Sequence, residues 1–316
     1  MYSFGVIMNP IEKADINRDS TIAIIAALQE KSKIYYILPN TLHISNNKIY
    51  AKTGTLTINK KKKVFYEIKN IRLKELSTLN CILFRLDPPV DEHYIQITHI
   101  LDILESQGVL IINSPQSVRD FNEKLLGNKL TSKLVPTLVT SNEIFINSFL
   151  KKYKKIVIKP MNLMSGKGIV SLSHGNRSNK IIIKELIKEP KKYMICQKFL
   201  KEIVNGDTRI LITNGIVHEN VLVRYPPKND FRSNLSYGGR YKIKKINKKF
   251  INNLKEVALY LKYNRIYFAG VDMIGDYITE INITSPTGIK QIEESDKNIS
   301  KSIATEFINI INDHYD

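Results

Sequence analysis

The sequence predicts a mixed fold, in which an α/β domain with a parallel sheet precedes an α+β domain of mostly antiparallel strands. The first observation is that short apolar runs alternate with helical patterns up to about residue 122, an order typical of parallel sheets. The second is that later apolar runs come in pairs joined by short turns, as antiparallel hairpins do. A length of 316 residues also suits two domains of roughly 150 residues each. We therefore place a domain boundary near Asn122.

The N-terminal part is expected to alternate strands and helices. The predicted strands are 3–8, 33–38, 81–85 and 110–113, and the predicted helices are 20–31, 91–107 and 115–125. Asp19 or Ser20 is suited to cap the first helix, because a side-chain oxygen can accept hydrogen bonds from its first N–H groups. Gly108 is suited to end the second helix. The stretch 53–69 departs from the alternation, and we expect exposed strands around a solvated turn at 59–63.

The second part is expected to form paired strands with few helices. The predicted strands are 155–159, 169–173, 193–199, 207–213, 216–224, 268–274 and 277–283, and the predicted helices are 141–150 and 248–261. Asn214-Gly215 predicts a tight hairpin turn, and Gly275-Asp276 predicts another. The polar segment 225–241 is expected to be a loop.

The chain is strongly basic, with 48 Lys and Arg against 30 Asp and Glu, which leaves a formal net charge of +18. Such a charge makes nucleic acid the first partner to consider. However, the lysines are spread along the whole chain together with many Ile and Asn residues, as in proteins from AT-rich genomes. We therefore expect no nucleic-acid partner, and an anionic small-molecule substrate would be served by the same field.

The remaining composition argues against several classes of protein. Cys81 and Cys196 are too few for a disulfide framework or a cysteine zinc site, and both lie in apolar runs, so we expect buried free thiols. The apolar run 4–8 ends at Asn9-Pro10 and is too short for a signal peptide. No stretch approaches the ~18 apolar residues of a transmembrane helix. The sequence therefore predicts a soluble cytoplasmic protein without a membrane partner.

Three oxygen-bearing side chains are brought together by the hairpin predicted around residues 275–276. Because side chains alternate along a strand, Glu280 and Asn282 share one face, and Asp272 on the partner strand can reach the same patch. Carboxylate and amide oxygens without a histidine suit a hard cation such as Mg²⁺. The alternative, a sheet with one polar and solvated face, stays open.

A lysine at the end of a strand could contact phosphate groups. Lys159 leads into a Gly-containing turn, 160–168, and then into another strand. Such a turn could cover phosphates held by the lysine. The spacing is not that of a Walker A loop, and no helix follows. Taken alone, this pattern fits a simple hairpin turn better.

Arginines occur in two further places that suit anion binding. Arg232 and Arg240 flank a loop of small residues and could clamp carboxylates or phosphates in a bidentate manner. Arg85 stands at the carboxyl end of a strand, where open α/β sheets place their ligands. The alternatives are a mobile surface loop made basic by composition, and an Arg85 that only pairs with Asp87.

Taken together, the motifs resemble the bacterial-type glutathione synthetases, which are ATP-grasp ligases. The resemblance covers nearly the whole chain and rests on the segments 8–10, 85–89, 113–124, 158–160, 197–200, 206–209, 232–240 and 279–288. The most specific piece is Thr279–Gly288, which reads TEINITSPTG. Each motif alone is weak, but all of them in one order make the resemblance strong.

The resemblance implies a fold and a reaction. The fold would be an N-terminal α/β substrate domain over 1–122 and an ATP-grasp domain over 123–316, with a central lobe at about 123–200 and a C-terminal lobe at about 201–316. The reaction would be the ligation of γ-glutamylcysteine and glycine to glutathione. ATP would be cleaved to ADP and phosphate through an acyl phosphate, with Mg²⁺ or alternatively Mn²⁺ as the metal. The family also suggests a cytoplasmic homotetramer.

The resemblance also implies roles for individual residues. The implied catalytic arginines are Arg209, Arg232 and Arg240. The residues implied to bind ATP are Lys124, Lys159, Ser165, Gly166, Gln197, Lys198, Phe199, Leu200 and Asp207, the last either through the ribose or as a support of the site. Those implied to bind the peptide, glycine or the acyl phosphate are Arg85, Arg224, Asn234, Ser285, Pro286 and Thr287. The implied metal ligands are Asp272, Glu280 and Asn282.

The sequence departs from the family pattern in two loops. The segments 161–168 and 226–231 are poorer in glycine than the family, and Leu86 stands where the family tends to have lysine. Because fewer glycines restrict the backbone, we expect catalysis to be retained with slower loop closure. Two alternatives stay open. One is another ATP-grasp ligase with a different acid and amine, such as a glutamate-adding or D-alanine-joining enzyme. The other is a non-catalytic basic binding protein that kept the fold.

Overall fold

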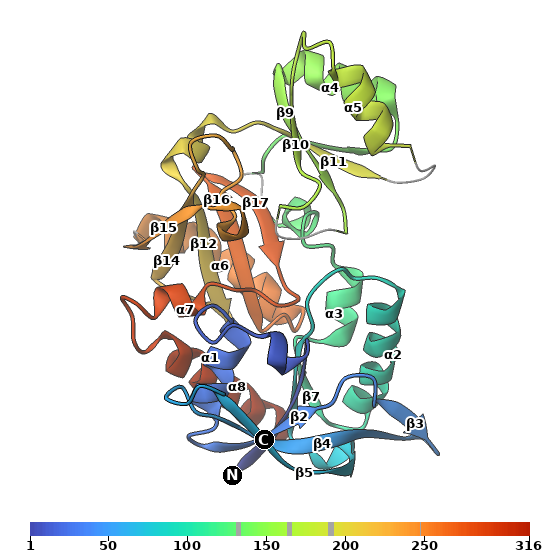
Figure 1. The fold of residues 1–316 in the computed structure, drawn as a ribbon, viewed down its shortest axis with the longest axis vertical. Coiled ribbons are helices and arrows are strands. Elements are labelled where there is room, and N and C mark those ends of the chain that lie inside the picture. The colour runs from blue at the N-terminus through green and yellow to red at the C-terminus, as the bar shows by residue number, and fades with distance from the viewer. Residues whose placement is uncertain (131–133, 163–165, 189–192, 247) are drawn as a thin grey trace.

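The chain folds into three sheets that follow one another along the long axis of the molecule (Figure 1). The computed structural model describes residues 1–130, 134–162, 166–188, 193–246 and 248–316. The N-terminal sheet lies at one end, and a small sheet from the centre of the sequence lies at the other. The middle sheet, from the C-terminal half, lies between them and borders both.

The N-terminal sheet has a parallel centre and an antiparallel extension. Its strands are β1 (Tyr2–Met8), β2 (Ser32–Ile37), β3 (His43–Ser45), β4 (Lys48–Ile58), β5 (Tyr66–Glu75), β6 (Cys81–Arg85) and β7 (Leu110–Ile112). Their order is β3-β4-β2-β1-β6-β7, and β5 pairs with β4. The pairs among β2, β1, β6 and β7 are parallel, so these strands end at one common edge. That edge faces the middle sheet, and open α/β sheets bind their ligands at this edge.

Helices cover both faces of the N-terminal sheet. They are α1 (Ser20–Leu28), α2 (Glu92–Ser106) and α3 (Pro115–Asp120). Asp19 caps α1, because its Oδ1 accepts hydrogen bonds from the N–H groups of Thr21 and Ile22 at 2.7 and 3.0 Å. The buried side chains of α1 join one core cluster and those of α2 another, so the sheet is packed on both sides.

The last helix, α8 (Ile299–Tyr315), packs against α1 although it follows the middle sheet in sequence. It is preceded by the short helix α7 (Ile289–Ile292). Phe307 of α8 contacts Phe268 of the middle sheet edge-on, with ring centroids 6.0 Å apart. The hydroxyl of Tyr2 donates a hydrogen bond to Oδ1 of Asn312 at 2.5 Å, so the two ends of the chain lie side by side. One apolar core therefore joins the N-terminal sheet to the C-terminal helices.

The small sheet is antiparallel and is covered by two helices. It contains β8 (Thr137–Thr140), β9 (Lys155–Pro160), β10 (Val170–Ser173) and β11 (Met194–Lys198), in the order β10-β9-β11-β8. The helices α4 (Glu143–Tyr153) and α5 (Asn179–Leu186) cover it. Ile146, Leu150 and Ile183 from these helices are buried in its core.

The middle sheet carries most of the charged residues expected at the site. Its strands are β12 (Asp207–Thr213), β13 (Ile216–Val217), β14 (Asn220–Tyr225), β15 (Arg240–Lys245), β16 (Phe268–Ile274) and β17 (Tyr277–Asn282). Their order is β15-β14-β12-β16-β17, all antiparallel, and β13 pairs with β12. The helix α6 (Lys248–Tyr263) packs on it through Leu254, Val257 and Leu261. Asn214 and Gly215 have φ of 52° and 81°, as the predicted tight turn requires.

Asn113 ties the N-terminal sheet to the middle sheet. This buried residue follows β7, and its Nδ2 donates hydrogen bonds to the carbonyl oxygens of Phe268 and Ile283 at 2.7 and 2.6 Å. Its Oδ1 accepts a third bond from the N–H of Phe268 at 2.8 Å. Since Phe268 begins β16 and Ile283 follows β17, one side chain fixes the strands that carry the candidate metal ligands.

The mixed fold is confirmed, whereas several element boundaries were wrong. The predicted helix 115–125 ends at Asp120, because Phe121 turns to an extended backbone with φ −111° and ψ 120°. The loop expected up to residue 241 gives way to β15 at Arg240. The strand expected over 216–224 is split into β13 and β14. The strand β8 and the helices α5, α7 and α8 were not predicted. Short 3₁₀ turns complete the described elements, at Ile11–Lys13, Leu76–Thr78, Leu126–Lys129, Lys201–Asn205 and Leu235–Tyr237.

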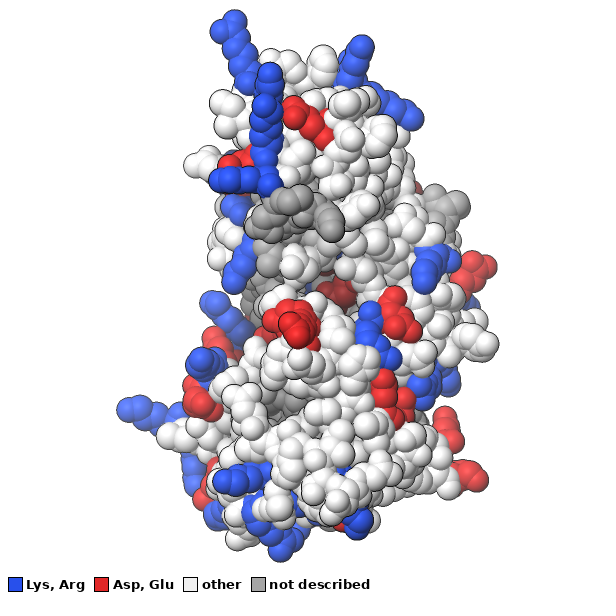
Figure 2. All heavy atoms as spheres, turned by 90° about the vertical axis from the view of Figure 1, so that its right-hand side faces the viewer, with Lys and Arg blue, Asp and Glu red and all other residues white. Residues whose placement is uncertain are grey.

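The cysteines, the helices and the surface charges each bear on what the composition predicted. Cys81 and Cys196 are buried free thiols, as predicted, and burial raises the pKa of Cys196 to about 12. Among the helices in the described ranges, none is long and apolar enough to cross a membrane. On the face shown in Figure 2, Lys and Arg are scattered over the whole length of the molecule.

His218 makes stability depend on pH. Its buried ring places Nε2 2.9 Å from Oγ1 of Thr213. Burial lowers the pKa of His218 from 6.5 to about 4. The unfolded chain therefore binds more protons than the folded chain between these two pH values. The stability that neutral His218 contributes is fully present above pH 6.5 and is lost as the pH falls towards 4.

We expect His218→Asn to flatten the fall in the free energy of unfolding between pH 6.5 and pH 4. The shift in the pKa of His218 corresponds to a loss of up to about 3 kcal/mol in the free energy of unfolding across this range. Urea unfolding followed by circular dichroism at several pH values measures it. His93→Asn, on the exposed first turn of α2, is the matched control and should keep the wild-type slope. An unchanged slope in the His218 variant would contradict the assignment.

Candidate active site

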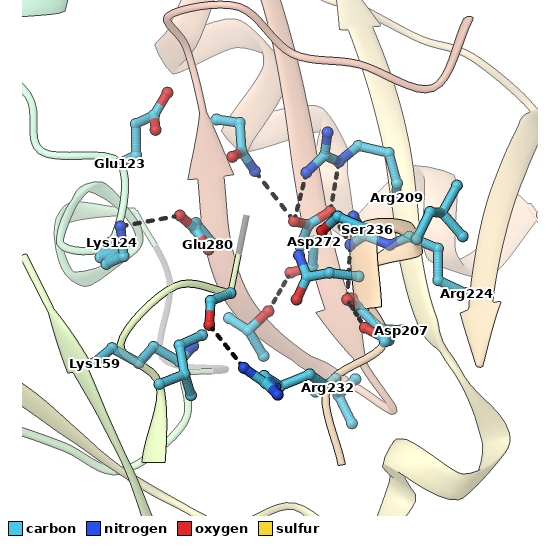
Figure 3. Close-up of a pocket in the computed structure, with 18 of the residues that line it drawn as sticks. Glu123, Lys124, Lys159, Asp207, Arg209, Arg224, Arg232, Ser236, Asp272 and Glu280 are labelled. Atoms are coloured by element: carbon cyan, nitrogen blue, oxygen red, sulfur yellow. Dashed lines mark hydrogen bonds and ion pairs between the residues drawn. The ribbon is translucent and has the colours of Figure 1, made fainter. Parts of the chain in front are cut away.

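A cavity of about 420 Å³ lies where the three sheets meet. Figure 3 shows the charged side chains that surround it. The small sheet contributes Lys159 and the segment 197–200, and the middle sheet contributes Asp207, Arg209, Arg224, Asp272, Glu280 and Asn282. The N-terminal part contributes Arg18 and Asp87, and the turn after α3 contributes Glu123 and Lys124. Residues that are far apart in the sequence therefore line one cavity.

Asp272 is the centre of a buried network of charges. Arg209 donates two hydrogen bonds to it, from Nε to Oδ1 at 2.6 Å and from Nη2 to Oδ2 at 2.7 Å. Nη2 of Arg224 lies 2.9 Å from Oδ1. Burial alone would raise the pKa of Asp272, but the two guanidinium groups outweigh it and hold the pKa below its usual value. The carboxylate therefore stays charged and keeps both arginines aligned along the cavity wall.

Asp207 extends this network towards the loop before β15. Its Oδ2 accepts hydrogen bonds from Nη2 of Arg224 and from Oγ of Ser233, both at 2.7 Å. Burial raises the pKa of Asp207, although Arg224 opposes the shift. Oδ1 of Asp207 and Nε of Arg224 are buried without a hydrogen-bond partner. Because buried polar atoms are normally paired, these two atoms point to a site for a further polar group.

The three candidate metal ligands share one face of the hairpin β16–β17. Asp272 is paired in register with Glu280, and Gly270 with Asn282. Nδ2 of Asn282 lies 3.1 Å from Oδ2 of Asp272, and Oε1 of Glu280 lies 3.4 Å from Nζ of Lys124. Two carboxylates and one amide are hard oxygen donors of the kind Mg²⁺ prefers.

The donor set fits a cation that takes its other ligands from phosphate and water. In the part of the chain that the structure describes, no three His, Cys, Asp or Glu side chains could hold a metal ion by themselves. A site here therefore has to include the amide of Asn282. Both oxygens of Asp272 already accept hydrogen bonds from arginine, so Glu280 is the more accessible carboxylate.

Two lysines reach the cavity from different segments (Figure 3). Lys159 comes from β9, and burial lowers its pKa, while Glu280 opposes the shift. Lys124 comes from the turn after α3, on the side of the N-terminal part. The end of β11 lines the cavity between them with Gln197 and the residues up to Leu200. The structure thus brings Lys124 and Lys159, which the resemblance assigns to ATP, to one cavity.

The loop before β15 contacts the turn after β9. Nη1 of Arg232 lies 3.5 Å from the carbonyl oxygen of Gly166, and the guanidinium of Arg232 stacks 3.7 Å from the ring centroid of Tyr237. Gly166 has φ +80°, and a Cβ there would lie 2.7 Å from Oδ1 of Asn234. Glycine is therefore required where the two loops meet. Ser165, which was also expected to bind ATP, lies outside the described residues.

Arg85 does not line the cavity, in contrast to the expectation that it binds substrate. It is buried, and its Nη2 and Nε donate hydrogen bonds to the carbonyl oxygen of Pro286 at 2.9 Å and to Oγ1 of Thr21 at 3.2 Å. Burial lowers its pKa to about 10. The suggested pairing with Asp87 is absent among the ion pairs of the described residues, and Arg85 instead supports the loop that follows β17.

Arg240 also lies outside the cavity wall. It begins β15 and its side chain is exposed, whereas Arg232 and Asn234 of the same loop line the cavity. The sequence indicated a pair of flanking arginines but not the strand that starts at the second. The alternation of charged and apolar residues over 240–244 is the sequence signal that could have shown this strand.

Several residues that line the cavity were not predicted. Oε1 of Glu123 accepts hydrogen bonds from the N–H groups of Ile283 and Thr284 at 2.7 and 2.9 Å. Asp87 accepts one from Oγ of Ser285 at 2.5 Å. Both carboxylates belong to motifs already singled out, but no pattern in the sequence shows which loop they meet.

Known proteins resemble both parts of the chain. A family model of the prokaryotic glutathione synthetase N-terminal domain matches residues 2–119, and a model of the prokaryotic glutathione synthetase ATP-grasp domain matches residues 123–297. The glutathione synthetase of Buchnera aphidicola subsp. Baizongia pistaciae is 40% identical over 294 residues, which is 92% of this chain and 91% of the relative. That of Coxiella burnetii is 32% identical over 312 residues, 98% of this chain and 96% of the relative.

Solved structures share the fold at low sequence identity. The crystal structure of a D-cycloserine synthetase has a TM-score of 0.68 at 10% identity and covers 98% of this chain and 99% of its own. The D-alanine–D-alanine ligase of Coxiella burnetii has a TM-score of 0.61 at 11% identity and covers 100% of this chain and 96% of its own. Together with the two family models, these likenesses show the ATP-grasp fold behind an N-terminal domain. The chain belongs to the prokaryotic glutathione synthetase family.

Proposed function

We propose that the chain joins γ-glutamylcysteine and glycine to form glutathione, with cleavage of ATP to ADP and phosphate. The observation that carries this proposal is the convergence of lysines, arginines and oxygen donors on one cavity between three sheets. Relatives that match more than nine-tenths of the chain are glutathione synthetases. No observation favours a different acid and amine, or a non-catalytic basic binding protein.

The reaction needs an activated carboxylate, because a carboxylate ion is a poor electrophile. In the first step an oxygen of the cysteinyl carboxylate bonds to the γ-phosphorus of ATP, and the bond from that phosphorus to the β,γ-bridging oxygen breaks, releasing ADP. In the second step the glycine nitrogen bonds to the acyl carbon after losing a proton. The bond from that carbon to the phosphate oxygen then breaks, phosphate leaves, and the nitrogen loses a second proton to give the amide, both protons passing to solvent or to the released phosphate. No protein nucleophile is required, so the work of the chain is positioning and charge neutralisation.

The cationic side chains have distinct roles in this proposal. Lys124 and Lys159 contact the ATP phosphates, and Arg209 neutralises charge on the transferring phosphoryl group. Asp272 acts through its ion pairs, because it fixes Arg209 and Arg224 in one orientation. Preorganised donors of this kind need no rearrangement when charge develops.

The metal proposed for this site is Mg²⁺, with Mn²⁺ as the alternative. Asp272, Glu280 and Asn282 would hold it, as their shared face and oxygen chemistry support. A divalent cation bound there would neutralise the phosphate oxygens and orient them for in-line transfer. Glu280 would then contact the metal in place of Lys124, which would be left to contact the phosphates.

The remaining contacts divide between the nucleotide and the acid. The segment 197–200, at the end of β11, would bind the adenine edge through Gln197, Lys198, Phe199 and Leu200. Gly166 would cover the phosphates, and Asp207 would either bind the ribose or support Arg224. The residues proposed to contact the peptide, glycine or the acyl phosphate are Arg224, Arg232, Asn234, Ser285, Pro286 and Thr287. Arg85 would act through Pro286 rather than by direct contact.

We also propose an organisation for the whole molecule. An N-terminal domain over 1–122 would supply the wall for the acid, and the lobes at about 123–200 and 201–316 would enclose the nucleotide. Ile71 and Leu73 are more than half exposed on β5, and these two exposed apolar side chains are the observation that supports association of chains into a homotetramer. We propose the cytoplasm as its location.

The homotetramer can be tested by light scattering coupled to size exclusion. We expect a mass four times that of the 36.3 kDa chain. Leu73→Lys places a charge on the exposed strand and should lower that mass, whereas Thr57→Lys on the neighbouring strand β4 should leave it unchanged. A wild-type protein of one chain mass at micromolar concentration would rule out the tetramer.

Lys159→Met tests the phosphate contact. The variant keeps the length of the side chain but removes its charge, so we expect the KM for ATP to rise by about ten- to a hundredfold. Phosphate release at varied ATP concentration measures it. Lys180→Met, an exposed residue of α5, removes the same charge from the same part of the molecule and should keep the wild-type KM. Equal KM values in all three proteins would refute the contact.

Glu280→Gln tests the metal site. Loss of one carboxylate charge should raise the Mg²⁺ concentration for half-maximal activity by at least about tenfold, because hard cations prefer ionised oxygen ligands. Titration of phosphate release with Mg²⁺ at saturating ATP measures it. Asp276→Asn, in the exposed turn of the same hairpin, is the control and should titrate like the wild type. A Glu280 variant with an unchanged Mg²⁺ requirement would exclude Glu280 as a ligand.

A further inference from the structure

The carboxylates that line the cavity differ in their partners. Asp207 and Asp272 form ion pairs with arginine, and Glu280 forms one with Lys124. Asp87 and Glu123 line the same cavity, but their hydrogen bonds come from neutral donors only. Neither of these two carboxylates takes part in the ion pairs of the described residues, and Arg85 interacts with Asp87 only at longer range. A partly buried carboxylate without a cation can bind a positively charged group of a substrate.

The carboxylate of Asp87 is fixed by hydrogen bonds and can accept further ones. It follows β6, at the edge of the parallel strands that faces the middle sheet, and it is half-buried. Oγ of Ser285 donates to its Oδ1 at 2.5 Å, and Nδ2 of Asn9 donates to its Oδ2 at 2.8 Å. An ionised carboxylate has about four acceptor positions, and two are used here. The position of the carboxylate is therefore fixed by the protein, and it can still accept bonds from a ligand.

We propose that Asp87 binds the α-ammonium group at the γ-glutamyl end of the acid substrate. This inference rests on the proposed function, which supplies a dipeptide with one ammonium group and two carboxylates. The ammonium of γ-glutamylcysteine lies seven bonds from the reacting carboxyl carbon, or roughly 9 Å in an extended chain. Ser285, which contacts Asp87, is three residues after Asn282 and so lies at most about 10 Å from it along the backbone. A peptide that places its reacting end near Asn282 can therefore reach Asp87.

Glu123 is the other carboxylate that could take this role, and the contacts disfavour it. Its Oε1 already accepts three hydrogen bonds, two from the N–H groups of Ile283 and Thr284 and one from Oγ1 of Thr284 at 2.8 Å. Burial and the charge of Glu280 both raise the pKa of Glu123, which places it beside the proposed metal site. Asp87 meets the loop one residue further from Asn282, at Ser285 rather than at Thr284.

Recognition of the ammonium would make Asp87 a specificity-determining residue. An acid that lacks the amino group would desolvate this carboxylate without supplying a cation to compensate its charge, which disfavours the binding of that acid. The suitable probe is N-glutarylcysteine, which differs from γ-glutamylcysteine only in lacking the α-amino group. The measured quantity is kcat/KM for each peptide at saturating ATP, Mg²⁺ and glycine, followed by phosphate release and by glutathione formation where the natural peptide is used.

Asp87→Asn is the main variant, and it removes the charge while keeping the size of the side chain. We expect kcat/KM for γ-glutamylcysteine to fall by about ten- to a hundredfold, mainly through KM, and kcat/KM for N-glutarylcysteine to stay within twofold. The ratio of kcat/KM for γ-glutamylcysteine to kcat/KM for N-glutarylcysteine should therefore be much lower in this variant than in the wild type. Asp87→Glu keeps the charge and should retain part of this preference, which gives a second test if the asparagine variant folds poorly.

Two further variants separate the explanations. Glu92→Gln removes one exposed negative charge from the first turn of α2 and should keep the wild-type preference. Glu123→Gln should lower the activity with both peptides without changing the preference between them. A preference that survives in Asp87→Asn, or that is lost in Glu123→Gln instead, would overturn the assignment. If the wild type forms no glutathione from γ-glutamylcysteine and glycine, the proposed function itself fails, and the assignment fails with it.

Discussion

The geometry of the cavity depends on one carboxylate that two guanidinium groups bind at once. Asp272 lies on β16, Arg209 on the neighbouring strand β12, and Arg224 on β14 beyond it. Because a buried charge without a partner is strongly destabilising, this network is compatible only with the observed strand order and register. A slip of one residue in either pair would turn a charged side chain into the apolar core beneath α6. The antiparallel order of the middle sheet and the alignment of the arginines are thus two aspects of a single constraint.

The N-terminal sheet contributes by fixing the loop that follows β17. Asn113 binds the backbone at Phe268 and Ile283, and Arg85 binds the carbonyl oxygen of Pro286. Both residues stand at the carboxyl ends of parallel strands, so their positions follow from the strand direction. The packing of α8 on α1 adds an apolar core that spans the same junction. The wall of the cavity is therefore held from both sheets, and neither part would define it alone.

How much could be predicted from the sequence depended on whether a contact is local. Strand alternation placed Asp272, Glu280 and Asn282 on one face, because period-two patterning and a tight turn are local properties. Arg85 was expected to touch a ligand, but its partners Thr21 and Pro286 are 64 and 201 residues away, and no local pattern identifies them. The helix α8 was not predicted, although its local pattern was available, since Ile303, Phe307 and Ile310 recur at helical spacing.

The low glycine content of the loops 161–168 and 226–231 is a local property, and its effect depends on what the loops contact. Low glycine content restricts a loop only where the backbone must adopt a positive φ or approach another chain segment closely. Gly166 is such a position, since a Cβ there would collide with Asn234, and this glycine is present. The contact of Arg232 with the Gly166 carbonyl shows that the two loops can already meet with the residues they have. Substitution elsewhere in these loops then lowers the number of open conformations, so it affects the rate of closure more than the closed arrangement itself.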